Sequence, residues 1–169
     1  SVSPVCAKDV VDELKKKIKL IIDGGKSRIG IESTVVDLTG KPNILRPGII
    51  SSKLVHKVLK TKINILRKSR KLRSPGMLKK HYSPGIPIIL NKKPNNEQFA
   101  LITFGKKYKN KKNYFNLSQK SDLKEAASNL YKTLRKIKKK KFKKIYIVKI
   151  PNIGPGIAIN DRLKRASKK

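Results

Sequence analysis

Four residues with hydrogen-bonding side chains stand where the chain could present them to a charged small molecule. Arg46 ends the apolar run of "NILRPG", and a guanidinium held at a strand end can bind a phosphate or carboxylate through two parallel bonds. Ser33 lies in "GIESTVVDLTG", where its hydroxyl could hold a substrate carboxylate. His81 and Tyr82 are neighbours in "SPGMLKKHYSPG" and form a donor pair that could reach a phosphate. Each could equally be structural, with Arg46 facing solvent and Ser33 on an ordinary strand face.

The sequence offers little for nucleophilic or metal catalysis. Cys6 is the only cysteine, and His56 and His81 are the only histidines, so a zinc site and an internal disulfide are not expected. These residues also assemble no Ser/His/Asp or Cys/His arrangement, and the carboxylates form no persuasive acid/base pair. The "GGKS" at 24–27 has Leu20 where a phosphate-binding loop needs its first Gly, so we interpret it as a tight turn.

The net charge of +34 comes from 44 Lys and Arg against 10 Asp and Glu, and it has two interpretations. A polyanion partner is one, and a basic RNA-binding module is therefore our alternative function. The other is a compositional bias, because most of the basic residues are Lys and they are spread along the chain. The densest runs are "KKKIK", "RKSRKLR" and "KIKKKKFKK".

Length and hydropathy indicate a globular chain. Hydrophobic residues make up 37% of the 169 positions and occur in short clusters bounded by turns. No apolar run approaches the ~20 residues of a membrane span, and we identify no signal peptide. We therefore expect a soluble, cytoplasmic protein without a membrane partner. The chain begins with Ser1 in the middle of a pattern, without the strand expected before its first helix, so we expect a fragment.

The elements that must position Ser33 and Arg46 follow from periodicity and turn signals. Ser3 and Pro4 are typical of a helix start. The alternation in 30–40 places Ser33 and Glu32 on opposite faces of a strand. The predicted elements are a helix over 4–17, strands over 19–23, 30–40 and 43–48, and a helix from Ser51 or Ser52 through Leu59.

The second half predicts a small α/β unit. "IPIIL" and "FALITF" are continuous apolar runs, typical of strands buried on both faces of a parallel sheet covered by helices. The predicted strands are 86–90, 99–104, 113–118 and 144–150, and the predicted helices are 121–138 and 156–169. We divide the chain into domains over 1–66 and 86–169, joined by a linker over 67–85.

Four blocks together resemble the threonylcarbamoyl-AMP synthase family, the two-domain form of the YrdC-type fold. They are "SPVCAKDVVDEL", "LIIDGGKSRIGIESTVVDLTGKPNILRPG", "SPGMLKKHYSPGIPI" and "DLKEAASNLYKTLRKI…GIAINDRLKRAS". The resemblance implies an α/β fold class. Residues 1–66 would be the carboxy-terminal part of a YrdC-like twisted α/β domain and 67–85 a linker acting as a lid. Residues 86–169 would form a small Rossmann-like α/β domain with a mainly parallel sheet.

The same resemblance implies an enzyme, a nucleotidyltransferase that forms threonylcarbamoyl-AMP and pyrophosphate from L-threonine, bicarbonate and ATP for tRNA modification. By motif, Ser33 would contact L-threonine, and Arg46, His81 and Tyr82 would bind ATP. Mg²⁺ would accompany the nucleotide, and no protein nucleophile or protein metal ligand is implied. A downstream tRNA threonylcarbamoyl-transferase complex would be an indirect partner, and direct tRNA binding stays open.

Two departures from the family pattern bear on activity. The family's amino-terminal half, with a basic substrate segment and a Ser-Ala-Asn motif, has no counterpart in this sequence. Val5 stands where the family often has Thr, so a nucleotide contact there could use only the backbone. We therefore expect this chain to be inactive alone.

Overall fold

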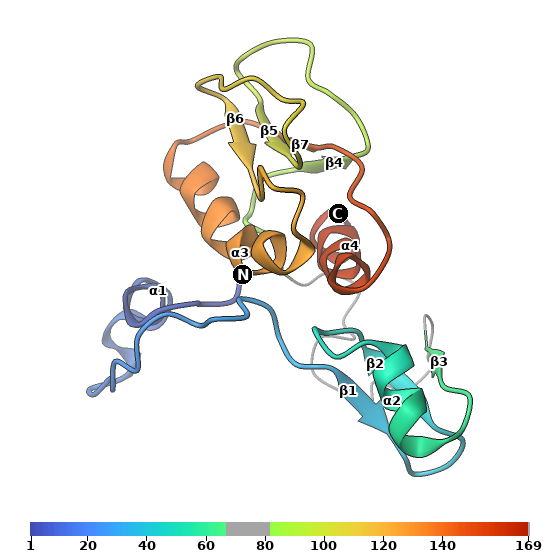
Figure 1. The fold of residues 1–169 in the computed structure, drawn as a ribbon. Coiled ribbons are helices and arrows are strands. Elements are labelled where there is room, and N and C mark those ends of the chain that lie inside the picture. The colour runs from blue at the N-terminus through green and yellow to red at the C-terminus, as the bar shows by residue number, and fades with distance from the viewer. Residues whose placement is uncertain (67–81, 169) are drawn as a thin grey trace.

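Two separate β-sheets organise the chain in this computed structural model, which describes residues 1–66 and 82–168 (Figure 1). Three strands form the first sheet and four strands form the second. Most of the predicted linker, including His81, lies outside the described residues. No helix in the described part combines the length and the apolar character needed to cross a membrane.

The first sheet carries the predicted Ser33–Arg46 region. It contains β1 (Val35–Asp37), β2 (Asn43–Arg46) and β3 (Asn64–Ile65), with β1 antiparallel and β3 parallel to β2. Helix α2 (Ser52–Leu59) connects β2 to β3, and the Ser51 hydroxyl caps it by accepting from the Leu54 N–H at 3.3 Å. The predicted helix boundary at Ser51 or Ser52 is therefore confirmed, whereas β3 was not predicted.

Three predictions near the amino terminus are wrong: the strand over 19–23, the bounds of the strand over 30–40 and the bounds of the helix over 4–17. The strand over 19–23 does not form, and Leu20 and Ile22 are 80% and 88% exposed. A strand needs a neighbour to satisfy its backbone groups, and none of the described strands pairs with this segment. The strand over 30–40 shortens to β1, so Ser33 lies just before it.

The first helix, α1, covers Ala7–Leu14 instead of 4–17 and continues into the short 3₁₀ helix η1 over Lys15–Lys17. It begins late because Ser3 does not cap it: the Ser3 hydroxyl donates to Glu32 instead. The Asp9 carboxylate accepts from the Val5 N–H at 3.0 Å. Neither α1 nor α2 fully buries a residue, and Val11, Leu14, Leu54 and Val58 of their apolar stripes are exposed.

The second sheet confirms the predicted parallel α/β arrangement. Its strands are β4 (Ile88–Leu90), β5 (Ala100–Thr103), β6 (Tyr114–Asn116) and β7 (Ile145–Ile147), in the order β4-β7-β5-β6 and all parallel. Helix α3 (Leu123–Lys139) connects β6 to β7, and α4 (Pro155–Ala166) follows β7. The Asp122 carboxylate caps α3 by accepting from the N–H groups of Lys124 and Glu125.

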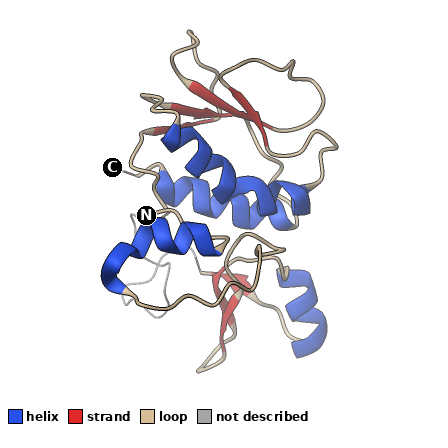
Figure 2. Cartoon of the chain, turned by 90° about the vertical axis from the view of Figure 1, so that its left-hand side faces the viewer, coloured by secondary structure: helices blue, strands red, loops and turns tan. Residues whose placement is uncertain are grey.

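Both long helices lie on the same side of this sheet (Figures 1 and 2). All four residues of β5 are fully buried, as its continuous apolar run predicts. The helices do not cover both faces, however; half-buried Phe104 and Tyr108, from the connection between β5 and β6, pack against the core. The core side chains from the helices are Ala126, Ala127, Leu130, Tyr131, Leu134 and Ile137 of α3, and Ala158, Ile159, Leu163 and Ala166 of α4.

Segments from the first half of the chain complete this core. Buried Val2, Ile31 and Tyr82 belong to the same hydrophobic cluster as α3 and α4. Arg135 of α3 donates to the carbonyl of Val2 and lies 3.6 Å from the Asp9 carboxylate. The residues just before Ser33 are therefore held against the second α/β unit.

Candidate functional site around Ser33, Arg46 and Tyr82

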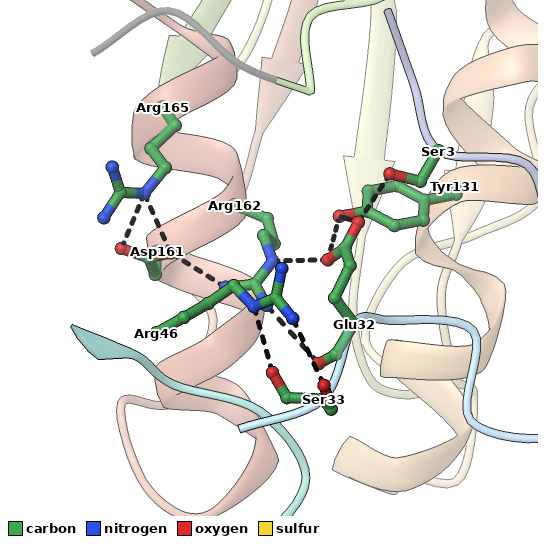
Figure 3. Close-up of polar contacts among 8 residues, drawn as sticks. All are labelled: Ser3, Glu32, Ser33, Arg46, Tyr131, Asp161, Arg162 and Arg165. Carbon is green, nitrogen blue, oxygen red and sulfur yellow. Dashed lines mark hydrogen bonds and ion pairs between the residues drawn. The ribbon is translucent and has the colours of Figure 1, made fainter. Parts of the chain in front are cut away.

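Arg46 holds Ser33 through two hydrogen bonds from one guanidinium. Its Nε donates to the Ser33 carbonyl at 3.0 Å, and its Nη2 donates to the Ser33 hydroxyl at 3.2 Å (Figure 3). Arg46 ends β2, and the antiparallel pairing places Val35 opposite it, so the side chain can reach Ser33, two residues before β1. Ser33 itself is exposed. The pair therefore presents a cation and a hydroxyl together at an accessible position.

Glu32 turns away from this pair into a polar cluster between α3 and α4 (Figure 3). The Tyr131 hydroxyl lies 3.0 and 2.8 Å from its two carboxylate oxygens, Arg162 Nε donates to it at 2.7 Å, and the Ser3 hydroxyl also donates to it. Burial alone would raise the pKa of Glu32, but the hydrogen bonds from Ser3 and Arg162 and the charge of Arg162 hold the pKa below its ordinary value. Glu32 is therefore a carboxylate in the folded protein.

Among the residues that the structure describes, Arg162 is the largest fully buried side chain, with 1% of its surface exposed. Besides its bond to the Glu32 carboxylate, its Nη2 lies 3.5 Å from the Glu32 carbonyl and its Nη1 donates to Asp161 at 2.8 Å. Burial acts to lower the pKa of Arg162, but the bond to Glu32 and the nearby negative charge keep the pKa above its ordinary value. The guanidinium is thus a permanent buried cation whose N–H groups already bond to Glu32 and Asp161.

The ring of Tyr82 lies close to both Arg162 and Tyr131. The Arg162 guanidinium carbon is 5.1 Å from the centre of the Tyr82 ring, and the Tyr131 ring stacks with it at a centre-to-centre distance of 5.9 Å and an interplanar angle of 19°. Tyr82 is 1% exposed and has a φ of +64°, a left-handed conformation that is uncommon outside Gly. Burial raises the pKa of its hydroxyl, and the positive charges of Arg162 and Arg46 oppose this rise.

The structure brings three of the four sequence-predicted site residues into one region. Ser33 bonds to Arg46, and the ring of Tyr82 lies against Arg162, which bonds to Glu32, the neighbour of Ser33. His81 lies outside the described residues. Val5 uses both backbone groups within the chain, because its N–H donates to Asp9 and its carbonyl accepts from the Ser27 N–H at 2.9 Å.

Sequence reasoning missed Glu32, Tyr131 and Arg162 as neighbours of the predicted site. One signal for Arg162 was present in the sequence. In α4 the buried positions 158, 162 and 166 recur at intervals of four, and only the middle one carries a charge. A charged residue in the apolar stripe of a helix must be paired, so its partner was worth seeking.

Comparison with known proteins identifies the family. Residues 49–168 match the family described as "Threonylcarbamoyl-AMP synthase, C-terminal domain", and residues 1–48 match one described as "Telomere recombination". The chain belongs to the threonylcarbamoyl-AMP synthase family, as the resemblance implied.

Among curated relatives, the threonylcarbamoyl-AMP synthase of Pyrococcus abyssi is 31% identical over 183 residues, covering 98% of this chain and 54% of the relative. That of Bacillus subtilis is 30% identical, covering 98% and 53% respectively. The chain therefore spans about half the length of the curated relatives it matches.

Two solved structures share the fold. The crystal structure of P. abyssi Sua5 complexed with L-threonine matches with a TM-score of 0.86 and 30% identity, covering 99% of this chain and 54% of that chain. A variant of the same protein, with a His and a Tyr each replaced by Ala, matches with a TM-score of 0.84 and 29% identity, over the same shares.

Proposed function

We propose that the protein containing this chain is an L-threonylcarbamoyladenylate synthase, which joins L-threonine, bicarbonate and ATP into threonylcarbamoyl-AMP and releases pyrophosphate. Family membership supports this proposal, as does the similar structure that holds L-threonine. The observation that carries it is the Arg46–Ser33 pair beside Tyr82, because it places a guanidinium and an exposed hydroxyl together. Those groups suit a carboxylate and a phosphate.

In this proposal each predicted residue has one role. The Ser33 hydroxyl binds the L-threonine carboxylate. Arg46 binds a phosphate of ATP, in keeping with its position at the end of β2 next to Ser33. Tyr82 and His81 belong to a lid that lies over the phosphates and excludes water as the site closes.

The reaction needs positioning more than a protein nucleophile. The threonine amine and bicarbonate form a carbamate and release water; a carbamate oxygen then attacks the α-phosphorus of ATP, the new O–P bond forms and pyrophosphate leaves. Negative charge accumulates on the phosphates during this step, so fixed cations such as Arg46 stabilise it. The protein's residues would therefore bind, orient and neutralise.

Mg²⁺ would come with the nucleotide. In residues 1–66 and 82–168 no three His, Cys, Asp or Glu side chains gather as a metal site. We propose that phosphate oxygens hold most of the ion's coordination positions, as is common for Mg²⁺. The ion would supply charge neutralisation at the phosphates, beside that of Arg46.

ATP–pyrophosphate exchange that depends on both L-threonine and bicarbonate tests the function in the protein containing this chain. We expect Arg46→Ala and Tyr82→Phe to reduce exchange. Arg46→Lys should be only partly active, because an ammonium group lacks the parallel N–H donors of a guanidinium. Arg28→Ala, at an exposed position outside the site, is the control. Unchanged exchange in both Arg46→Ala and Tyr82→Phe would remove the site assignment.

We also propose that the 169-residue chain alone is inactive, since it covers only about half of its relatives. The same exchange assay on the isolated chain tests this. Exchange that requires L-threonine and bicarbonate would contradict it.

The adenylate would serve tRNA modification, with a downstream tRNA threonylcarbamoyl-transferase complex as an indirect partner. The alternative function, a basic RNA-binding module, draws on the +34 charge. Measuring RNA affinity at several salt concentrations distinguishes this alternative from the synthase. Tight, steeply salt-dependent binding without exchange activity would favour the alternative.

A further inference from the structure

We infer that Arg162 is a positioning residue of the site: from α4 it fixes the Glu32–Ser33 segment and the ring of Tyr82 in one arrangement. The inference rests on the proposed function for Ser33 and Tyr82. It assigns a task to the second α/β unit, whose last helix would hold both substrate-facing segments at once.

The first step is the cost of burying a guanidinium. An unpaired buried charge is strongly destabilising, so Arg162 is compatible with the fold only where its partners are fixed too. Its hydrogen-bond partners are the carboxylate and the carbonyl of Glu32 and the carboxylate of Asp161. Of these, Glu32 lies 130 residues away in the sequence, so the pairing is a long-range constraint on the Glu32 segment.

The second step is the direct link from Glu32 to Ser33. Arg162 and Tyr131 hold the Glu32 side chain on one side, while Arg46 holds the carbonyl and the hydroxyl of Ser33 on the other. Figure 3 shows the two guanidiniums, of Arg46 and Arg162, approaching this dipeptide from neighbouring elements. The direction of the Ser33 hydroxyl therefore depends on both arginines.

The third step is Tyr82. Its ring lies 5.1 Å from the same Arg162 guanidinium, and its backbone has the uncommon left-handed conformation. Such a conformation persists only where the surroundings fix it, and the stacking of Tyr82 on Tyr131 and Arg162 supplies that constraint. Loss of Arg162 would thus release the described end of the linker, which begins at Tyr82, as well as the Ser33 segment.

Arginine is required here because of its geometry. Nε and Nη1 donate to two different carboxylates, and Nη2 approaches the Glu32 carbonyl. A lysine carries the charge as a single point and cannot reproduce these directions. Arg162→Lys therefore separates the geometry from the charge.

The matched control is Arg165, one turn along α4. Its Nε donates to both Asp161 oxygens at 3.1 and 3.0 Å, and Arg162 also donates to Asp161. Arg165→Met therefore removes an ion pair from the same helix and reveals any effect that passes through Asp161 and not through Glu32. We compare it with Arg162→Met, Arg162→Lys and Glu32→Gln in the protein containing this chain. Circular dichroism gives the folded fraction of each.

For Arg162→Met and Arg162→Lys we expect the KM for L-threonine to rise roughly 10- to 100-fold, the size of effect that a small misplacement causes, with Arg165→Met near wild type. A merely structural role would lower kcat with the folded fraction and leave the KM unchanged. That result, or a fully active Arg162→Lys, would overturn the inference. If Arg162→Met does not fold, Arg162→Lys and Glu32→Gln carry the test.

A double-variant cycle checks that Arg162 acts through Glu32. We expect Arg162→Met with Glu32→Gln to be no worse than the more damaging single variant, because both remove the same interaction. Fully multiplicative losses in kcat/KM would contradict this.

Amide hydrogen exchange provides a measurement independent of activity. We expect faster exchange in the segments 31–34 and 82–86 of Arg162→Met, and wild-type exchange there in Arg165→Met. If the wild-type protein lacks synthase activity, the proposed function fails, and the exchange data alone decide whether Arg162 fixes both segments. Unchanged exchange in both segments would reject the positioning role.

Discussion

Gly30 lies against the backbone of Ser128 on α3: a Cβ atom added to Gly30 would stand 2.6 Å from the Ser128 Cα and 2.6 Å from its carbonyl oxygen. The φ of Gly30 is +71°, which also disfavours a side chain. Ser128 and Tyr131 are three residues apart and share a face of α3. This close approach therefore brings the following Glu32 within reach of the Tyr131 hydroxyl.

Gly30→Ala is expected to lower the free energy of unfolding by about 2 kcal/mol or more, because it combines a backbone clash with a strained conformation. Chemical denaturation measures the change. Gly24→Ala is the control, since nothing lies within 4 Å of a Cβ atom at Gly24. Equal stability of the two variants would show that the segment before Ser33 does not need this close packing.

Tyr131→Phe is expected to destabilise the protein by about 2 kcal/mol, because it removes a buried hydroxyl that bonds to the charged Glu32. The pKa of Glu32 should rise at the same time, since its carboxylate loses a donor. Tyr146→Phe is the control, because the Tyr146 ring packs on Phe99 away from this cluster. The prediction fails if both variants unfold at the same denaturant concentration.

Acid should weaken the fold partly through Glu32. Its folded pKa lies below the ordinary 4.5, so its contribution to stability is present above that pH and is lost as the pH falls through the lower folded pKa. Glu32→Gln should therefore lose less stability than wild type when the pH is lowered from about 5 to about 2.5. Asp12 and Glu13, whose pKa values are also lowered, remain in both proteins. If chemical denaturation shows the same loss of stability on acidification in wild type and in Glu32→Gln, the role of Glu32 is contradicted.

The second α/β unit was predictable because its signals are local. The continuous apolar runs became buried parallel strands, and the stripe predicted over 121–138 became α3 with Asp122 as its cap. Apolar periodicity reports which face of an element is buried, and here the buried faces meet within one unit.

The first half was less predictable because its contacts are distant. Ser3 has the residue type of a helix cap, but it donates to Glu32, 29 residues away. The apolar "KLIID" run has the pattern of a strand, yet it stays exposed where no described strand pairs with it. In the site, Ser33 and Arg46 were predicted from the family resemblance of their motifs. The pairing of Glu32 with Arg162 has only one local signal in the sequence, a charge within an apolar helix stripe.

The position of Gly48 beside the Ser33 segment explains why this residue is a glycine. The sequence favours a simple strand stop at Pro47 and Gly48, but the structure gives Gly48 a second task. A Cβ atom there would stand 2.3 Å from the Thr34 N and 2.6 Å from the Ser33 carbonyl carbon, so only Gly allows the chain after Arg46 to pass this close.

We expect Gly48→Ala to displace the Ser33 hydroxyl and raise the KM for L-threonine roughly 10-fold or more in the protein containing this chain. Gly40→Ala, where a Cβ atom would meet nothing within 4 Å, should leave the KM unchanged. Steady-state kinetics on both variants, corrected for the folded fraction, measures the difference. A wild-type KM in folded Gly48→Ala would mean that the position of the Ser33 backbone does not govern threonine binding, and the role proposed for Ser33 would then have to be abandoned.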